Sequence, residues 1–346
     1  LHSKSMNSEF NHIQTAHCEN GVTVNLLRMA GHEYMTEALA FGMGAGLFYF
    51  HLPFFTFANG PAVSFRTMPG KIFKRTCNSL QIEVASKKFR NIITAQNYLD
   101  TLLSNGHIVG CQVGVFHLPY FPIEYRFHFN AHNLLVYGKQ DTTYMVSDPV
   151  MDKVTTLQQE ELNRVRFAQG MLAPKGHLYY ITKSKPTDKT TIQKAIAQGI
   201  RINTRDMLHI PGNFGGVSGI LYTANKITKW RETLGVRKAG QYLAQIIRMQ
   251  EEIGTGGGGF RFMYAAFLEQ AYNYIPNEQL LTISDEFTKA GDLWRANAVN
   301  MAGVLRGRST EQKDFETIAD VMKQIYAIEK QACIQLQNLK LHTRYV

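Results

Sequence analysis

Residues 131–149 read AHNLLVYGKQDTTYMVSDP, and this stretch decides the architecture of the N-terminal half. Two apolar segments of β-strand type flank the polar run GKQDT, which has the length of a hairpin loop. A loop over residues 138–142 would place Leu135 opposite Met145. The stretch therefore predicts two neighbouring antiparallel strands.

The same register places His132 directly opposite Asp148, with Cβ atoms about 4.5–5.5 Å apart on one face. A carboxylate at that separation can hold an imidazole in one tautomer. A slip of one residue would send the two side chains to opposite faces, so this expectation can fail. Two plainer interpretations stay open: His132 as a hydrogen-bonded core residue, and Asp148-Pro149 as the start of a turn.

Cys18 stands at the start of an apolar pattern of helical period that runs over residues 22–29. A thiol at a helix N-terminus has its thiolate favoured by the helix dipole and by free N–H groups. The alternative is a cysteine that only packs in a core. With His132 to take the proton and Asp148 to orient the imidazole, Cys18 completes a candidate catalytic triad. An early nucleophilic helix followed by late strands is the chain order of papain-like cysteine hydrolases.

The composition is that of a globular protein with 346 residues, of which 45% are hydrophobic and 18% charged. This length allows two domains, each with its own core. No apolar run is long enough for a transmembrane helix, and the polar start LHSKSMNSEF is unlike a secretory signal. Four widely spaced cysteines form neither a disulfide framework nor a zinc site. We therefore expect a reducing, cytoplasmic location and no bound metal.

Two domains are predicted, with a charged linker, KSKPTDKTT, at residues 183–191. Residues 1–183 have helical patterns mostly early and β-type patterns mostly late, with further helices expected at 69–80 and 93–106 and strands at 61–65, 81–85, 107–118, 131–138, 143–148 and 176–182. Residues 184–346 have helical period almost throughout. We therefore expect an α+β papain-like cysteine-hydrolase domain, with early helices and a late antiparallel sheet, followed by an all-α domain.

Two motifs of the first half, HCENGVTVNLLRMAG at 17–31 and FHFNAHNLLVYGKQDTTYMVSDP at 127–149, resemble the N-terminal domain family of butirosin biosynthesis protein H. That family is similar to papain-like peptidases, in particular those that process bacteriocin leaders. Two motifs of the second half, GNFGGVSGI at 212–220 and GTGGGGFRFMYAAFLEQA at 254–271, resemble the helical domain of unknown function that commonly follows it.

The resemblance implies an acyltransferase. The named member of the family moves an acyl group from an acyl carrier protein thioester to an amine of an antibiotic, and relatives lie in gene clusters for flexirubin and aryl polyene pigments, where a phenol ester would form. Cys18 would be the nucleophile, His132 the base and acid, and Asp148 the orienting carboxylate. The phosphopantetheine arm of the carrier would deliver the donor, with no bound cofactor. The alternative is a peptidase or thioesterase that uses the same three residues.

The sequence offers a candidate for each of two oxyanion donors. Papain-like peptidases use a glutamine a few residues before the cysteine, and Gln14 lies closer than the usual spacing. The Cys18 backbone N–H is the expected first donor, with Gln14 as the candidate second donor. His128 is a rival base, because it would point to the same strand face as His132 in an extended run.

The net charge of +10 favours an acidic partner. An acidic acyl carrier protein fits, whereas no recognised nucleic-acid motif is present and the charge is diffuse, so we expect no nucleic acid partner. The candidate docking surface, with an ordinary solvated surface as the alternative, consists of Arg66, Lys71, Lys74, Arg75, Lys87, Lys88 and Arg90.

Three further segments have two interpretations each. The glycine-rich run at 254–259 with Arg261 could hold an anion such as the pantetheine phosphate, or could be a tight turn with a structural ion pair. The aromatic segments at 47–57 and 116–127 could line a site for an apolar acyl chain, or could simply be core.

Overall fold

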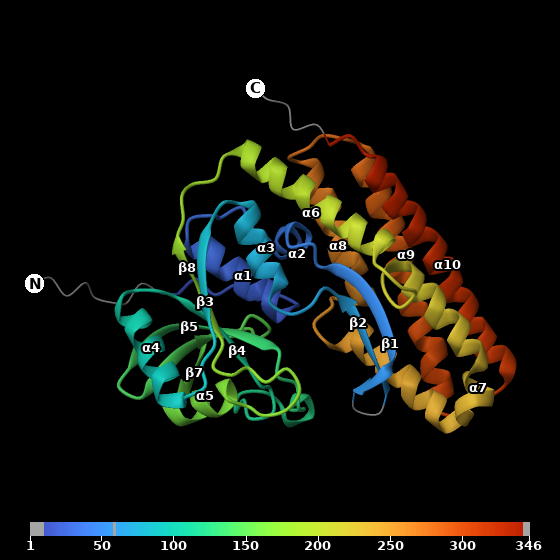
Figure 1. Ribbon diagram of the computed structural model, residues 1–346, viewed down its shortest axis with the longest axis horizontal. Coiled ribbons are helices and arrows are strands. Elements are labelled where there is room, and N and C mark those ends of the chain that lie inside the picture. Colours follow the sequence, from blue (N-terminus) through green and yellow to red (C-terminus); the bar gives the residue numbers. More distant parts are fainter. Residues whose placement is uncertain (1–9, 58–59, 342–346) are drawn as a thin grey trace, which may run out of the picture. The chain divides into compact units, whose positions relative to one another are not determined.

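The computed structural model describes residues 10–57 and 60–341. Contacts divide the chain into two units, each of which is discontinuous in sequence (Figure 1). The first, here called the sheet unit, comprises Leu1–Thr36 and Gln81–Pro186. The second, the helical unit, comprises Glu37–Leu80 and Thr187–Val346.

The sheet unit is built on a six-stranded sheet of order β3-β8-β4-β5-β6-β7, in which every neighbouring pair is antiparallel. Its strands are β3 (Glu83–Lys87), β4 (Val109–Val113), β5 (His132–Gln140), β6 (Thr143–Ser147), β7 (Thr155–Gln158) and β8 (Leu178–Lys183). Its helices are α1 (Cys18–Met29), α4 (Ile92–Ser104) and α5 (Gln159–Arg166), with a 3-10 turn, η1, at Ile123–Tyr125. The expected early helices and late antiparallel sheet are thus present, whereas β7 and α5 were not predicted.

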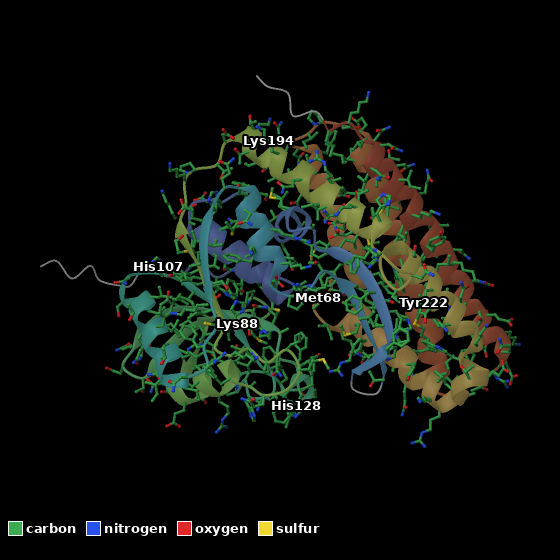
Figure 2. The ribbon with its side chains drawn as sticks, in the orientation of Figure 1. Met68, Lys88, His107, His128, Lys194 and Tyr222 are labelled. Carbon is green, nitrogen blue, oxygen red and sulfur yellow. The ribbon has the colours of Figure 1, made fainter. Side chains whose placement is uncertain are left out.

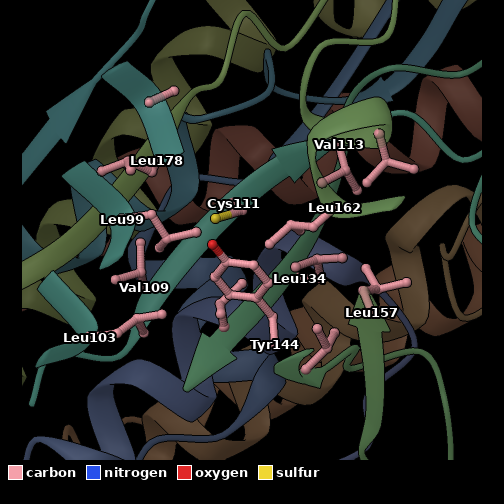
Figure 3. Close-up of a cluster of buried hydrophobic side chains, with 14 of the residues drawn as sticks. Leu99, Leu103, Val109, Cys111, Val113, Leu134, Tyr144, Leu157, Leu162 and Leu178 are labelled. Carbon is pink, nitrogen blue, oxygen red and sulfur yellow. The ribbon is translucent and has the colours of Figure 1, made fainter. Parts of the chain in front are cut away.

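The core of the sheet unit lies where α4 and α5 pack on one face of the sheet (Figure 3). Residues of period two along β5, Leu134 and Val136, enter this core together with Leu99 of α4 and Leu162 of α5. The alternate residues of β5 face the other way, and α1 packs there against β4 and β5. The alternation of a strand therefore separates an apolar core from the face that receives α1.

The β5–β6 hairpin has a different register from the expected one. Leu135 pairs with Ser147, two positions beyond the predicted partner. The predicted five-residue loop is also wrong, because the strands continue to a two-residue turn formed by Asp141 and Thr142. A bulge after Val136 shifts the pairing along the hairpin, and such a bulge cannot be recognised from the apolar pattern alone.

His132 and Asp148 consequently do not lie directly opposite each other. Continuing the Leu135–Ser147 pairing places Asp148 opposite Leu134, two residues from His132. Side chains two positions apart share a face, and such diagonal neighbours remain within reach when the side chains are long. The expectation that both side chains share one face is therefore met through a different register.

The helical unit contains seven α-helices in the described residues: α2 (Glu37–Met43), α3 (Lys71–Ser79), α6 (Lys189–His209), α7 (Gly216–Ile247), α8 (Arg261–Tyr272), α9 (Gln279–Leu305) and α10 (Gln312–Asn338). A π-helical turn, η2 (Arg248–Glu252), follows α7, and a 3-10 turn, η3 (Gly258–Phe260), precedes α8. The helices after the linker match the expected all-α segment. None of the described helices is long and apolar enough to cross a membrane.

The helical unit also includes the strands β1 (Leu47–Phe57) and β2 (Gly60–Arg66), which form a two-stranded antiparallel sheet. The structure thus differs from the predicted division at residue 183, because residues 37–80 pack with the C-terminal helices. Phe41 stacks on Phe260 with ring centroids 5.0 Å apart, and Tyr49 stacks on Trp294 at 5.8 Å. Apolar periodicity shows that these segments are buried but cannot show against which partner.

Candidate active site

Cys18 is the first residue of α1 and is buried, with 7% of its surface exposed. His17 caps the helix, because its ring Nδ1 accepts a hydrogen bond from the Asn20 backbone N–H at 3.4 Å. The Cys18 sulfur therefore lies beside the positive end of the helix dipole, as the sequence predicts. The sequence did not single out His17 as the cap, since histidine is not among the usual N-cap residues.

His132 lies at the start of β5, and its Nε2 donates a hydrogen bond of 2.7 Å to Oδ2 of Asp148. The Asp148 side chain is completely buried, and two further donors hold it. The Tyr120 hydroxyl donates to Oδ2 at 2.8 Å, and the backbone N–H of Val150 donates to Oδ1 at 3.2 Å. A buried carboxylate with three donors is fixed in position and orients the imidazole in turn.

The other side of the His132 ring faces the thiol. His132 forms a side-chain hydrogen bond with Cys18, and because Asp148 occupies Nε2, the nitrogen available to sulfur is Nδ1. Burial lowers the pKa of His132, but Asp148 and Cys18 raise it, and the resulting pKa is about 10. The imidazole therefore holds a proton at neutral pH, between the Asp148 carboxylate and the Cys18 sulfur.

Two aromatic residues near His132 come from the loop that precedes β5. Phe121 packs its ring edge-on to the His132 ring, with centroids 5.3 Å apart, and the neighbouring Tyr120 holds Asp148. Burial raises the pKa of the Tyr120 hydroxyl, and the Asp148 carboxylate raises it further. The hydroxyl therefore stays protonated and donates. Part of the aromatic segment 116–127 thus lies at the site, whereas the segment 47–57 is β1 of the helical unit.

Asn133 is a further polar residue at the sulfur, and the sequence reasoning missed it. Its Nδ2 lies 3.9 Å from Sγ of Cys18 and also donates to the Ala131 carbonyl at 3.1 Å. Its Oδ1 accepts a hydrogen bond of 2.9 Å from the Tyr179 hydroxyl. Its position directly after a candidate catalytic histidine was the one available signal.

Two other sequence candidates are placed differently. Gln14 is exposed, in the segment without regular secondary structure that precedes α1. His128 is exposed on the surface of the sheet unit and stacks on Phe116, with ring centroids 4.0 Å apart (Figure 2). The argument for His128 required an extended run up to His132, but β5 begins only at His132, so the predicted common face does not exist.

Arg261 is not available to an external anion, which corrects the candidate anion site. Its side chain is completely buried, and it forms a two-pronged ion pair with Glu329, with both N–O distances 2.8 Å. The third nitrogen, Nη1, donates to the Gly259 carbonyl at 2.7 Å. The glycine-rich run before it adopts positive φ at Gly256 and the three glycines that follow, which is the tight-turn interpretation.

The seven basic residues of the candidate docking surface are divided between the two units. Four belong to the helical unit, and three, Lys87, Lys88 and Arg90, to the sheet unit (Lys88 in Figure 2). Arg75 is half-buried, because it donates to the carbonyls of Gly44 and Ala45 and pairs with Asp206.

No cluster of three or more His, Cys, Asp or Glu side chains in the described part of the chain is placed to hold a metal ion. The buried thiols of Cys77, Cys111 and Cys333 have pKa values raised by burial, so they stay protonated and unreactive. Cys18 differs from them, because it begins a helix and contacts an imidazole.

Comparisons with known proteins agree with the sequence motifs. Residues 17–149 match the family described as butirosin biosynthesis protein H, N-terminal, and residues 160–336 match the domain of unknown function DUF4872. A solved structure described as a C39-like peptidase from Bacillus anthracis is 13% identical, with a TM-score of 0.36, over 52% of this chain and 98% of that chain. No curated protein gives a significant match. The chain therefore belongs to the DUF4872 family, and its residues 17–149 are similar to the N-terminal domain of butirosin biosynthesis protein H.

Proposed function

We propose that this chain is an acyltransferase that moves an acyl group from an acyl carrier protein thioester, through an acyl-Cys18 intermediate, to an amine or hydroxyl of a small secondary metabolite. The observation that carries the proposal is the buried chain of contacts from Cys18 through His132 to Asp148. The match of residues 17–149 to a family named for the biosynthesis of butirosin, an antibiotic, supports the metabolic context.

In the first step, the Cys18 thiolate attacks the carbonyl carbon of the donor thioester. The tetrahedral intermediate then expels the pantetheine sulfur, which takes the proton that His132 carries. A new Cys18–acyl thioester replaces the donor thioester, so the exchange is close to balanced in energy. The raised pKa of His132 suits this step, since the imidazole already holds the proton that the leaving thiolate needs.

In the second step, neutral His132 takes a proton from the acceptor amine or hydroxyl as it attacks the acyl-Cys18 carbonyl. The acyl group becomes an amide or ester, and the proton stays with the His132–Cys18 pair, which is thereby restored. Throughout, Asp148 holds the ring through Nε2 and keeps Nδ1 directed at the reacting atoms. Transfer competes with hydrolysis, so the site must exclude water while the acyl group is on the enzyme.

The loop that precedes β5 offers an apolar surface for the acyl group. It carries Tyr120 and Phe121 at the site and continues into Ile123 and Tyr125, whose side chains are 76% and 64% exposed. Exposed apolar side chains next to a reactive cluster are typical of a substrate surface. An acyl chain that leaves Cys18 along this loop would cover them.

An acidic carrier protein suits the charge of the chain. The net charge of +10 favours encounter with a negatively charged partner. The exposed candidates are Lys71 and Lys74 on α3 and Lys87, Lys88 and Arg90 in the sheet unit. The phosphopantetheine arm would then bring the thioester to Cys18.

The test is the intact mass of the protein after mixing with a panel of acyl-pantetheine and acyl-carrier thioesters. We expect a mass gain equal to the acyl group, and we expect Cys18→Ala to remove it. Cys77→Ala is the matched control, since this thiol is completely buried and should leave the adduct unchanged. No adduct with donors of several chain lengths would contradict the proposal.

The decay of the adduct separates transferase from hydrolase. Loss of the acyl group only when a candidate amine or phenol is added, with formation of the amide or ester, supports transfer. Equally fast loss in buffer alone would identify the alternative, a thioesterase or peptidase that uses the same three residues with water as the acceptor.

A further inference from the structure

The side-chain amide of Asn133 is the one side-chain N–H donor that the described contacts place at the Cys18 sulfur apart from His132. Its Nδ2 lies 3.9 Å from Sγ, and 95% of the residue's surface is buried. At this distance the sulfur is a weak hydrogen-bond acceptor for the amide, so the contact contributes little before an acyl group arrives. A buried donor that has only a weak acceptor in the resting enzyme can form a much stronger hydrogen bond once an oxyanion develops beside it.

The orientation of this amide is fixed from its oxygen end. The Tyr179 hydroxyl donates to Oδ1 at 2.9 Å, which leaves Nδ2 directed at the Ala131 carbonyl and at Sγ. Tyr179 can lie there because Gly110 has no side chain: a Cβ at that position would be 2.5 Å from the tyrosine ring. Three residues on neighbouring strands therefore preset the direction of one N–H bond.

Gln14, the candidate oxyanion donor from the sequence, is not buried at the Cys18 sulfur. Gln14, which the sequence suggested, is exposed in the segment before α1, whereas Asn133 is buried beside the sulfur. The oxygen of a tetrahedral intermediate is two bonds from Sγ. An amide 3.9 Å from Sγ can therefore reach the distance of about 2.7–3.1 Å at which an oxyanion donor acts.

We propose that the Asn133 side-chain amide, held by Tyr179, is the second oxyanion donor of this site, alongside the Cys18 backbone N–H. This inference rests on the proposed acyl chemistry at Cys18. It assigns Asn133 a role in stabilising the negative charge that develops on the carbonyl oxygen, and it assigns Tyr179 a positioning role.

The test compares two reactions of Cys18, only one of which develops an oxyanion. Acylation by p-nitrophenyl butyrate passes through a tetrahedral intermediate, whereas exchange with 2,2′-dipyridyl disulfide is an attack on sulfur that depends on the thiolate alone. We expect Asn133→Ala to slow acylation by about 10²–10³-fold and to leave disulfide exchange close to that of the parent chain. Tyr179→Phe keeps the amide but frees its orientation, and should slow acylation by about 2- to 10-fold.

Two variants make the comparison specific. Cys18→Ala removes both reactions and shows that they report on this thiol. Gln112→Ala removes the amide that lies directly across the β4–β5 pair from Asn133, and it should leave the ratio of acylation to exchange unchanged. A parallel fall of both rates in Asn133→Ala would overturn the inference, since it would mean that Asn133 only shapes the position or charge of the thiol. Unchanged acylation would overturn it as well.

The activated ester separates this inference from the proposed function. If the parent chain accepts p-nitrophenyl butyrate but no carrier or pantetheine thioester, the proposed donor is wrong while the effect of Asn133 is still measured. If Cys18 exchanges with the disulfide but accepts no acyl group at all, both proposals are wrong.

Discussion

Two buried polar clusters, one in each unit, use similar groups for different ends. In the helical unit, Arg261, Glu329 and Trp294 form a closed set: the guanidinium donates to both carboxylate oxygens and to a carbonyl, and the indole N–H adds a donor to Glu329. In the sheet unit, Asp148 contacts His132, and His132 in turn contacts the Cys18 sulfur, where the series of contacts ends.

The two clusters differ in whether the last group of the hydrogen-bonded set can give up a proton. Every nitrogen of the Arg261 guanidinium has a partner, so no proton can move without a large cost in an interior of low dielectric constant. The His132 imidazole holds a proton between a fixed carboxylate and a thiol, and that proton can be passed on. A closed buried cluster therefore stabilises one structure, whereas an open one can carry out chemistry.

The largest effect should come from opening the closed cluster. Glu329→Ala leaves the buried Arg261 charge without its partner, and we expect the free energy of unfolding to fall by about 3–5 kcal/mol. Chemical denaturation measures this loss. Glu316→Ala, an exposed carboxylate on the same helix, is the matched control, and a change of similar size in both variants would contradict the distinction.

In the sheet unit, Asp148→Asn should lower the rate at which Cys18 is acylated. The amide cannot supply the negative charge that helps hold the proton on His132, and we expect acylation of Cys18 to slow by about 10²–10³-fold. Stopped-flow acylation with a nitrophenyl ester measures this loss. A variant with normal acylation would show that the carboxylate is structural only.

The same variant should change the pH dependence of stability. Because the pKa of His132 rises from 6.5 to about 10 on folding, the folded chain holds a proton that the unfolded chain releases. This contribution is complete below pH 6.5 and is lost as the pH rises to about 10. Denaturation across that range should give a falling free energy of unfolding in the parent and a smaller fall in Asp148→Asn. Equal slopes would contradict the assignment.

A smaller effect is expected for Tyr120→Phe, which removes one of the three donors to Asp148. A single hydrogen bond contributes about 0.5–1.5 kcal/mol, so we expect a corresponding loss in stability or in acylation rate. The ring remains and keeps its packing, so the circular dichroism spectrum should match that of the parent. A loss as large as that of Asp148→Asn would mean that Tyr120 contacts the reacting atoms itself.

The smallest effect should come from surface charge. Lys71→Glu with Lys74→Glu, and separately Lys87→Glu with Lys88→Glu, should weaken acylation by an acyl-carrier protein at low salt, at about 0.2–1 kcal/mol per charge. Acylation by the free acyl-pantetheine should not change. The pair with the larger effect identifies the unit that docks the carrier, and equal losses with both donors would exclude docking as the cause.

Residue chemistry made part of this site predictable. Cys18, His132 and Asp148 stand out because few residue types can act as nucleophile, base and orienting acid, and because a helix start and two strands place them. The hairpin register was wrong, because the strands run on to a two-residue turn where a five-residue loop was expected, and the bulge after Val136 recovers only one position of that difference. The two chosen residues nevertheless meet, because a diagonal pair on one face tolerates this change of register.

Other parts of the site could not be predicted, because they depend on contacts between segments far apart in sequence. Tyr120 lies 28 residues before Asp148, and Tyr179 lies 46 residues after Asn133. Nothing local in either tyrosine distinguishes it from an ordinary core residue. Helix α5 was missed for another reason: its sequence, QEELNRVR, is mostly polar and has only three buried residues.

The discontinuous make-up of the two units has a consequence for how the chain is made. During synthesis on the ribosome, residues 37–80 emerge before the sheet unit is complete, but the helices that cover β1 and β2 begin only at Lys189. The β1–β2 hairpin therefore lacks its packing partners, and is exposed or bound by a chaperone, while more than a hundred residues are added. A fragment that stops at the linker would release that hairpin without its cover, and an expression strategy for this family should keep the chain whole.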